Sequence, residues 1–152
     1  MTYERFEDLP VWKSAQELAE QIYNLMETMG ERKLLSFALR DQLERAALSV
    51  SNNIAEGFER GTTPELLMFL YIARGSAGEV RSMLAFLERR DKWREYGEMV
   101  RELKILSESC SRQLRAWAEF LQNSPIKGQR HLNDKVRLKN EQSRQTEDFG
   151  MT

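Results

Sequence analysis

Apolar residues recur at steps of three and four in four separate stretches, the spacing typical of amphipathic helices. In the first stretch they are Trp12, Ala15, Leu18, Ala19, Ile22, Leu25, Met26 and Met29. In the second they are Leu35, Leu39, Leu43, Ala46, Ala47, Val50, Ile54 and Phe58. The third has a heptad pattern, formed by Leu66, Leu70, Ala73, Ala77, Val80, Leu84 and Leu87. The fourth contains Met99, Leu103, Leu106, Cys110, Leu114, Trp117 and Leu121.

Four helices of similar length with short connections favour an all-α fold, an up-down-up-down antiparallel four-helix bundle over residues 1–122. No stretch of the sequence alternates apolar and polar residues for long, so we expect no sheet. Residues 123–152 are strongly polar and have only four isolated aliphatic residues, Ile126, Leu132, Val136 and Leu138. We expect this C-terminal segment to be mostly disordered.

Turn-forming and capping residues predict where the helices begin and end. Asp8 is suited to cap the first helix, and Gly30 to end it. Thr63 is suited to cap the third helix, because Pro64 would then occupy its first position. The stretch RRDKWREYG (residues 89–97) marks the last junction, without defining its limits.

The composition is that of an ordinary globular chain, with 41% hydrophobic and 31% charged residues among 152. Cys110 is the only cysteine, so no intrachain disulfide can form and a reducing compartment is favoured. The N-terminus is polar and acidic, unlike a signal peptide. No apolar run approaches the roughly 20 residues of a membrane span. We therefore expect a cytoplasmic protein without membrane association.

The residues of most catalytic and cofactor sites are missing from the sequence. His131 is the only histidine and lies in the C-terminal segment, so neither a His-paired nucleophile nor a di-iron site of the bundle type is expected. No glycine-rich phosphate loop is present. Cys110 lies on an apolar stripe, where burial would raise the pKa of its thiol. We expect no enzyme, cofactor or metal; an enzyme using only carboxylates and lysines stays open, but nothing points to one.

The stretch SNNIAEG (residues 51–57) contains two asparagines and a glycine, which disfavour helix interiors. Apolar residues keep the helical spacing on both sides, so we expect the helix to continue through it. If Ile54 faces the core, the helical rotation of about 100° per residue places four residues on the opposite side, Arg45, Ser49, Asn52 and Glu56. The same rotation places two more on the flank, Asn53 and Gly57.

Two interpretations of this side stay open: a solvated back face, or a face covered by another copy of the chain. The third helix favours the second, because four further residues widen its apolar arc, namely Phe69, Ile72, Ser76 and Met83. The run GSAG (residues 75–78) would also allow another helix to approach closely. We predict that these four residues and the six of the second helix form an oligomer interface.

Three stretches resemble a known family. RAALSVSNNIAEGFER (residues 45–60), FLYIARGSAGEV (residues 69–80) and FEDLPVWKSAQELAEQIY (residues 6–23) are similar to the 23S rRNA intervening-sequence proteins, which are four-helix bundles. The similarity covers roughly residues 6–121, and its specific part is NIAEG (residues 53–57). Relatives often have proline where Ser51 stands, so we expect no proline kink here.

The resemblance implies a small helical subunit that assembles into a ring, commonly a homopentamer, without enzymatic activity. It makes a scaffold or interaction module the first hypothesis for function. The family is also similar to accessory proteins of diversity-generating retroelements, which bind nucleic acid and reverse transcriptase.

The alternative hypothesis is an RNA- or DNA-binding accessory protein. It would use the basic residues of the C-terminal segment and five arginines, Arg74, Arg81, Arg89, Arg90 and Arg94. The overall charge does not favour it: residues 1–122 hold 17 Lys and Arg against 20 Asp and Glu, and the C-terminal segment six against four. Nucleic-acid binders usually carry a basic excess, because phosphate neutralisation supplies much of their affinity.

Overall fold

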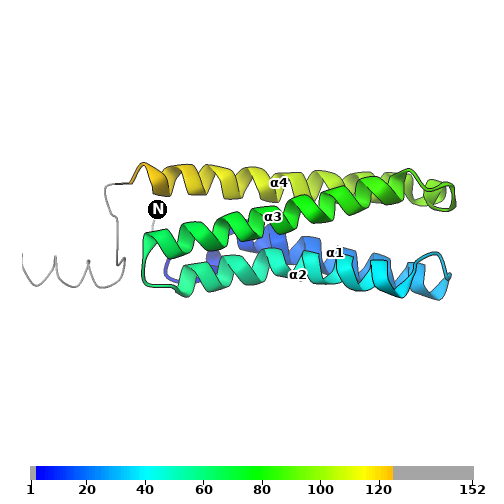
Figure 1. The fold of residues 1–152 in the computed structure, drawn as a ribbon, viewed down its shortest axis with the longest axis horizontal. Helices are drawn as coiled ribbons and strands as arrows, with labels where there is room; N and C mark the ends of the chain where they lie inside the picture. The colour runs from blue at the N-terminus through cyan, green and yellow to red at the C-terminus, as the bar shows by residue number, and fades with distance from the viewer. Residues whose placement is uncertain (1–2, 125–152) are drawn as a thin grey trace, which may run out of the picture.

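The structure is a computed structural model that describes residues 3–124. Its elements are η1 (Phe6–Asp8), α1 (Pro10–Glu31), α2 (Phe37–Glu59), α3 (Thr63–Glu88), η2 (Asp91–Tyr96) and α4 (Gly97–Gln122). The four long helices form an antiparallel bundle, and residues 3–124 contain no strand (Figure 1). The predicted all-α fold is confirmed. The predicted disorder of residues 125–152 lies outside the described residues.

The core lies along the bundle axis and is built mainly from the predicted stripes. Its largest fully buried side chains are Leu18, Ile22, Met26, Met29, Leu43, Ile54, Leu66, Leu70, Leu84, Leu87, Leu103 and Leu114. Among neighbouring helices of the bundle, the contacts of α3 with α2 and with α4 are the most extensive, and those between α1 and α4 are the least extensive. In the part of the chain that the structure describes, no helix is long and apolar enough to cross a membrane.

The polar stretch of residues 51–57 is helical, and the side chains of Ser51 and Asn53 have partners within the chain. The buried Ser51 hydroxyl accepts a hydrogen bond from Gln16 Nε2 at 3.0 Å and donates to the Leu48 carbonyl at 3.3 Å. Asn53 Nδ2 donates to the carbonyl oxygen of Ser49 at 2.7 Å and to its Oγ at 2.9 Å. The bond from Gln16 of α1 and the burial of Ile54 are tertiary contacts, and such contacts override the low helix propensity of the stretch. The predicted continuity of α2 is confirmed.

The helix limits differ from the prediction at two ends of α1. Asp8 belongs to the short helix η1, so Leu9 is the N-cap residue of α1, and its apolar side chain makes no capping bond. The helix also continues past Gly30 to Glu31. The left-handed backbone conformation that follows belongs to Lys33, with φ 55°.

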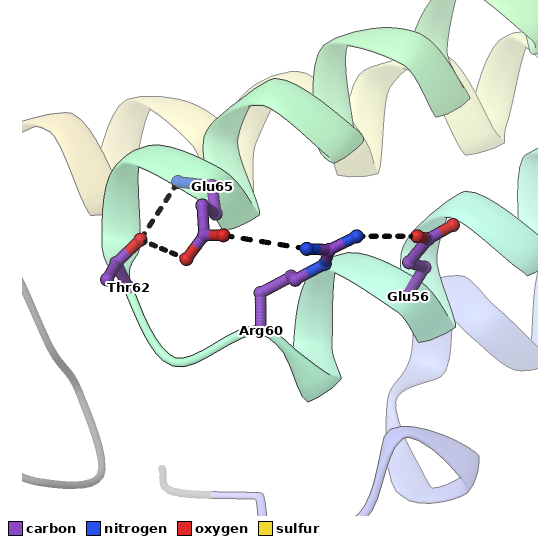
Figure 2. A network of polar contacts seen from close by, with 4 residues as sticks. All are labelled: Glu56, Arg60, Thr62 and Glu65. Atoms are coloured by element: carbon purple, nitrogen blue, oxygen red, sulfur yellow. Dashed lines mark hydrogen bonds and ion pairs between the residues drawn. The ribbon is translucent and has the colours of Figure 1, made fainter.

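The N-terminus of α3 begins one residue earlier than predicted. Thr62, not Thr63, caps it: its Oγ1 accepts from the Glu65 backbone N–H at 3.3 Å and donates to Glu65 Oε2 at 2.6 Å. Arg60 then joins the two helices, because its guanidinium lies 2.9 Å from Glu56 and 3.6 Å from Glu65 (Figure 2). This network fixes the tight turn between α2 and α3.

The last junction contains a helix that the sequence did not define. Trp93 of η2 is buried, and its Nε1 donates to the Leu34 carbonyl at 3.3 Å. Its burial ties η2 to the turn between α1 and α2. Just beyond η2, Met99 is half-exposed and Val100 is buried, so the predicted stripe is shifted at the start of α4.

Candidate interaction surfaces

The contact between α2 and α3 is closest at Gly57. A Cβ atom on Gly57 would lie 2.7 Å from Phe69 Cβ and 3.1 Å from Leu66 Cδ1. Only glycine permits this approach without displacing α3 or the Phe69 side chain. Arg60 covers the outside of Phe69, with its guanidinium carbon 5.0 Å from the ring centroid. The glycine of the polar stretch therefore serves packing within the chain.

Hydrogen bonds continue the α2–α3 contact toward the other end of the bundle. The hydroxyls of Ser49 and Ser76 lie 2.8 Å apart, so one donates to the other. Gln42 Nε2 donates to Glu79 Oε1 at 3.1 Å. Small and polar residues therefore join these two helices where a bundle more often has aliphatic residues.

The ten residues predicted for an oligomer interface fall into three groups. Gly57, Phe69 and Met83 are buried inside the single chain, so little of their surface is left for a partner. Ser49, Asn53 and Ser76 are half-buried, and their hydrogen bonds are made within the chain. The exposed group is Arg45, Asn52, Glu56 and Ile72.

Exposed side chains on the outside of this helix pair form a second feature, which we name the outer α2–α3 face. It consists of Arg45, Asn52, Glu56, Met68 and Ile72. Met68 and Ile72, one helical turn apart, are 51% and 45% exposed. The sequence analysis did not single out Met68, although its spacing of four from Ile72 was a usable signal. Whether another copy covers this face stays a prediction.

Charges on the outer α2–α3 face are neutralised locally along α2. Arg45 pairs with Asp41 at 3.7 Å and Glu56 pairs with Arg60 at 2.9 Å, each one turn apart. Arg45 and Glu56 therefore have separate partners, so α2 presents no unpaired charge from these two residues.

A basic groove lies on the opposite flank of α3, against α4, and we name it the arginine groove. It has a volume of about 220 Å³ and is lined by Arg74, Gly78, Arg81, Glu108, Ser111, Arg112 and Arg115. Gly78 leaves open space: a Cβ placed there would meet no atom within 4 Å. Four guanidinium groups and one carboxylate therefore surround a site without a side chain at its centre.

Ion pairs neutralise only the α4 side of the arginine groove. Arg112 lies 3.7 Å from Glu108, and Arg115 lies 2.9 Å from Glu119. Within residues 3–124, no carboxylate lies within 4 Å of the Arg74 or Arg81 guanidinium. The arrangement favours an anionic ligand, because arginine donors match the oxygens of phosphates and carboxylates.

The five predicted nucleic-acid contacts lie in three places. Arg74 and Arg81 lie in the arginine groove. Arg89 and Arg90 line a separate depression beside the half-exposed Phe86, and Arg90 lies over its ring. Arg94 pairs with Asp91 in η2 at 3.3 Å.

The sequence analysis did not single out Arg112 and Arg115. Their position beside Arg74 and Arg81 depends on the register of α4 against α3, which no local sequence pattern reports.

Reactive groups are scarce in the described part of the chain. Cys110 is fully buried, and burial raises the pKa of its thiol to about 11, so the thiol stays protonated at neutral pH. Residues 3–124 contain no group of three His, Cys, Asp or Glu side chains able to hold a metal ion.

Together these features define a small all-α bundle protein with two distinct outer surfaces on either flank of α3. The family model described as 23S rRNA-intervening sequence protein matches residues 7–119. The chain belongs to this family, as its sequence resemblance indicated.

A solved structure has the same fold. It is the crystal structure of a protein of unknown function from the S23 ribosomal protein family of Bacteroides thetaiotaomicron. The two chains are 24% identical and superpose with a TM-score of 0.64, covering 71% of this chain and 97% of the other. This similarity shows the fold. No curated protein matches the chain.

Proposed function

We propose that this chain is a non-enzymatic cytoplasmic protein whose copies assemble through the outer α2–α3 face into a homopentameric ring. The ring acts as a scaffold or interaction module. The observation that carries the proposal is the pair Met68 and Ile72. Both are about half exposed although they lie one turn apart on the same side of α3. Subunit contact would remove this apolar surface from water.

The surroundings of this pair match the anatomy of a subunit interface. The contacts Ser49–Ser76 and Gly57–Phe69 lie on either side of Ile72 along α3. Asn52 and Glu56 are exposed polar residues of α2 between Ser49 and Gly57, at the same level of the bundle as Ile72. Interfaces commonly have an apolar centre and a polar rim. Fully burying one Met or Ile side chain stabilises a contact by about 1.5–3 kcal/mol. Because the contact is repeated at every subunit boundary of a ring, burial of Met68 and Ile72 would contribute substantially to the free energy of assembly.

Native mass spectrometry of the Ile72→Asp variant tests this proposal. Ile105 offers a matched control, because it is 59% exposed on the outside of α4, away from α2. We expect the unchanged chain and Ile105→Asp to share one oligomeric mass. Ile72→Asp should dissociate toward the single-chain mass of 17.9 kDa while keeping its helical circular dichroism. Equal masses for all three proteins would refute this interface.

The arginine groove supports a second candidate function, RNA binding. Its lining carries four positive charges and one negative charge. The charge is also unevenly distributed: residues 3–62 hold seven Lys and Arg against eleven Asp and Glu, and residues 63–122 hold ten against nine. A locally basic surface can bind phosphates although the whole bundle is slightly acidic. Repetition of a weak site in a ring would raise the avidity for a long strand.

Titration with single-stranded RNA at two salt concentrations tests this candidate. The double variant Arg74→Gln/Arg81→Gln should weaken binding, and should reduce the slope of log affinity against log salt by about 1 for each phosphate contact removed. Arg5→Gln/Lys13→Gln removes the same charge from the N-terminal part of the chain and should leave the slope unchanged. Absence of binding at low salt, or an equal loss in both variants, would rule out the arginine groove as the RNA site.

A further inference from the structure

An apolar cleft opens between α1 and α4 at the end of the bundle where the described structure ends. Its volume is about 350 Å³, and Leu9 and Val11 form one wall while Trp117 and Phe120 form the other. The cleft lies between the two neighbouring helices of the bundle that have the least extensive mutual contact. Phe120 is 71% exposed, an unusual position for a phenylalanine two residues before the end of α4.

The segment that supplies Tyr3 and Leu9 to this cleft is acidic. The segment that leads into α1 begins at the cleft residue Tyr3 and carries Glu4, Glu7 and Asp8. Arg5 is its only basic residue, and it is already paired with Glu7 at 3.3 Å. An occupant with apolar side chains and positive charge would therefore match both the apolar lining of the cleft and the acidic segment beside it.

The chain itself continues from this point with a segment of that chemistry. Residues 125–140 contain five Lys and Arg against one Asp. They also contain the aliphatic residues Ile126, Leu132, Val136 and Leu138. The chain leaves α4 at Gln122, two residues beyond Phe120. Ten extended residues span up to roughly 35 Å, so the segment easily reaches the cleft.

We propose that residues 125–140 of the same chain bind in the cleft formed by Leu9, Val11, Trp117 and Phe120. Aliphatic side chains of the segment cover Trp117 and Phe120, and its basic residues lie beside the carboxylates of residues 4–8. The cleft is then the docking site of the chain's own C-terminal segment, on the other side of the bundle from the outer α2–α3 face. This inference is independent of the proposed function.

Paramagnetic broadening in the full chain tests the proposal. A nitroxide is attached at Asn133→Cys; the buried Cys110 thiol should not react, which labelling of the unchanged chain verifies. The chain carries 5-fluorotryptophan at its three tryptophans, so fluorine NMR resolves each ring. We expect the Trp117 signal to lose most of its intensity. Trp93, in η2 at the far end of the bundle, should keep its signal.

Two variants and one mixing experiment separate this proposal from its alternatives. Phe120→Ser should restore the Trp117 signal, whereas Phe37→Ser, which removes an 84% exposed phenylalanine at the start of α2, should not. The broadening should persist when the doubly labelled chain is diluted into a large excess of unlabelled chain. High salt should weaken it, because exposed charges are screened. An unchanged Trp117 signal, equal broadening of Trp93, or loss of broadening on dilution would overturn the proposal.

Discussion

The two flanks of α3 differ in whether their polar groups have partners within the described chain. Toward α2, the helix meets glycine, serine and asparagine side chains, and these contacts are completed within the chain. Toward α4, it presents Arg74 and Arg81 around an open glycine, with no described carboxylate within 4 Å. A polar flank whose groups are satisfied internally is part of the fold. On the α4 flank, Arg74 and Arg81 have no ion-pair partner among residues 3–124, which is why we propose a ligand there and not on the α2 flank.

Two glycines make this difference concrete. Gly57 is required by packing, because a Cβ atom at this position would lie 2.7 Å from Phe69 Cβ. Gly78 has free space around it and has no packing reason to be glycine. An unusual residue in a helix is therefore evidence of function only when contacts within the chain do not already explain it. For the predicted oligomer interface, this leaves the residues that are exposed in the single chain.

The largest effect is expected for Gly57→Ala. The new Cβ would overlap Phe69 Cβ, an atom fixed close to the backbone, and overpacking of this kind costs about 1–3 kcal/mol. The gain in helix propensity offsets at most about 1 kcal/mol. Urea unfolding should therefore show a lower free energy of unfolding. A more stable variant would mean that α2 and α3 are not in close contact at this point.

Ser76→Ala should have the next largest effect. It removes the hydrogen bond with the Ser49 hydroxyl, so the free energy of unfolding should fall by about 0.5–1.5 kcal/mol. Ser82→Ala is the matched control, because Ser82 is exposed on the same helix. Its stability should be unchanged or slightly higher. An equal loss in both variants would show that the Ser49–Ser76 bond contributes nothing.

Gly78→Ala should change stability in the direction opposite to Gly57→Ala. Alanine fits the open space and favours the helix, so the free energy of unfolding should rise by roughly 0.5–1 kcal/mol. Thermal unfolding of the two variants side by side measures the contrast. A destabilised Gly78→Ala variant would indicate that the arginine groove is closed in solution.

The smallest effect concerns the Glu88–Lys104 ion pair at the α4 flank, where Nζ and Oε2 lie 2.7 Å apart. The hydrogen bond from Lys104 lowers the pKa of Glu88 below its ordinary value of 4.5. Because the folded-state pKa is the lower one, the stabilisation is present above pH 4.5 and is lost as pH falls through the folded-state value.

Lys104→Met should therefore lower the unfolding temperature at neutral pH, and its difference from the unchanged chain should shrink in acid. Lys92→Met, at an exposed position of η2, should show no such pH-dependent difference. A constant difference for Lys104→Met across this pH range would contradict the assigned pKa shift.

The sequence predicted the helices well, because the apolar spacing that defines each stripe is local. Ile54 and Leu70 lie in the core as expected. Residues whose role depends on a neighbouring helix were harder to assign. The predicted interface includes Gly57 and Phe69, which pack against one another inside the chain, and the prediction did not associate Arg112 with Arg74. Both features depend on the register between helices, which is set by side-chain fit and not by periodicity.

The solution mass of the full chain tests the central claim most directly. We predict that light scattering at micromolar concentration gives one species near five times the single-chain mass of 17.9 kDa. A species of 17.9 kDa at every concentration would leave the outer α2–α3 face in water, and would contradict the proposed assembly.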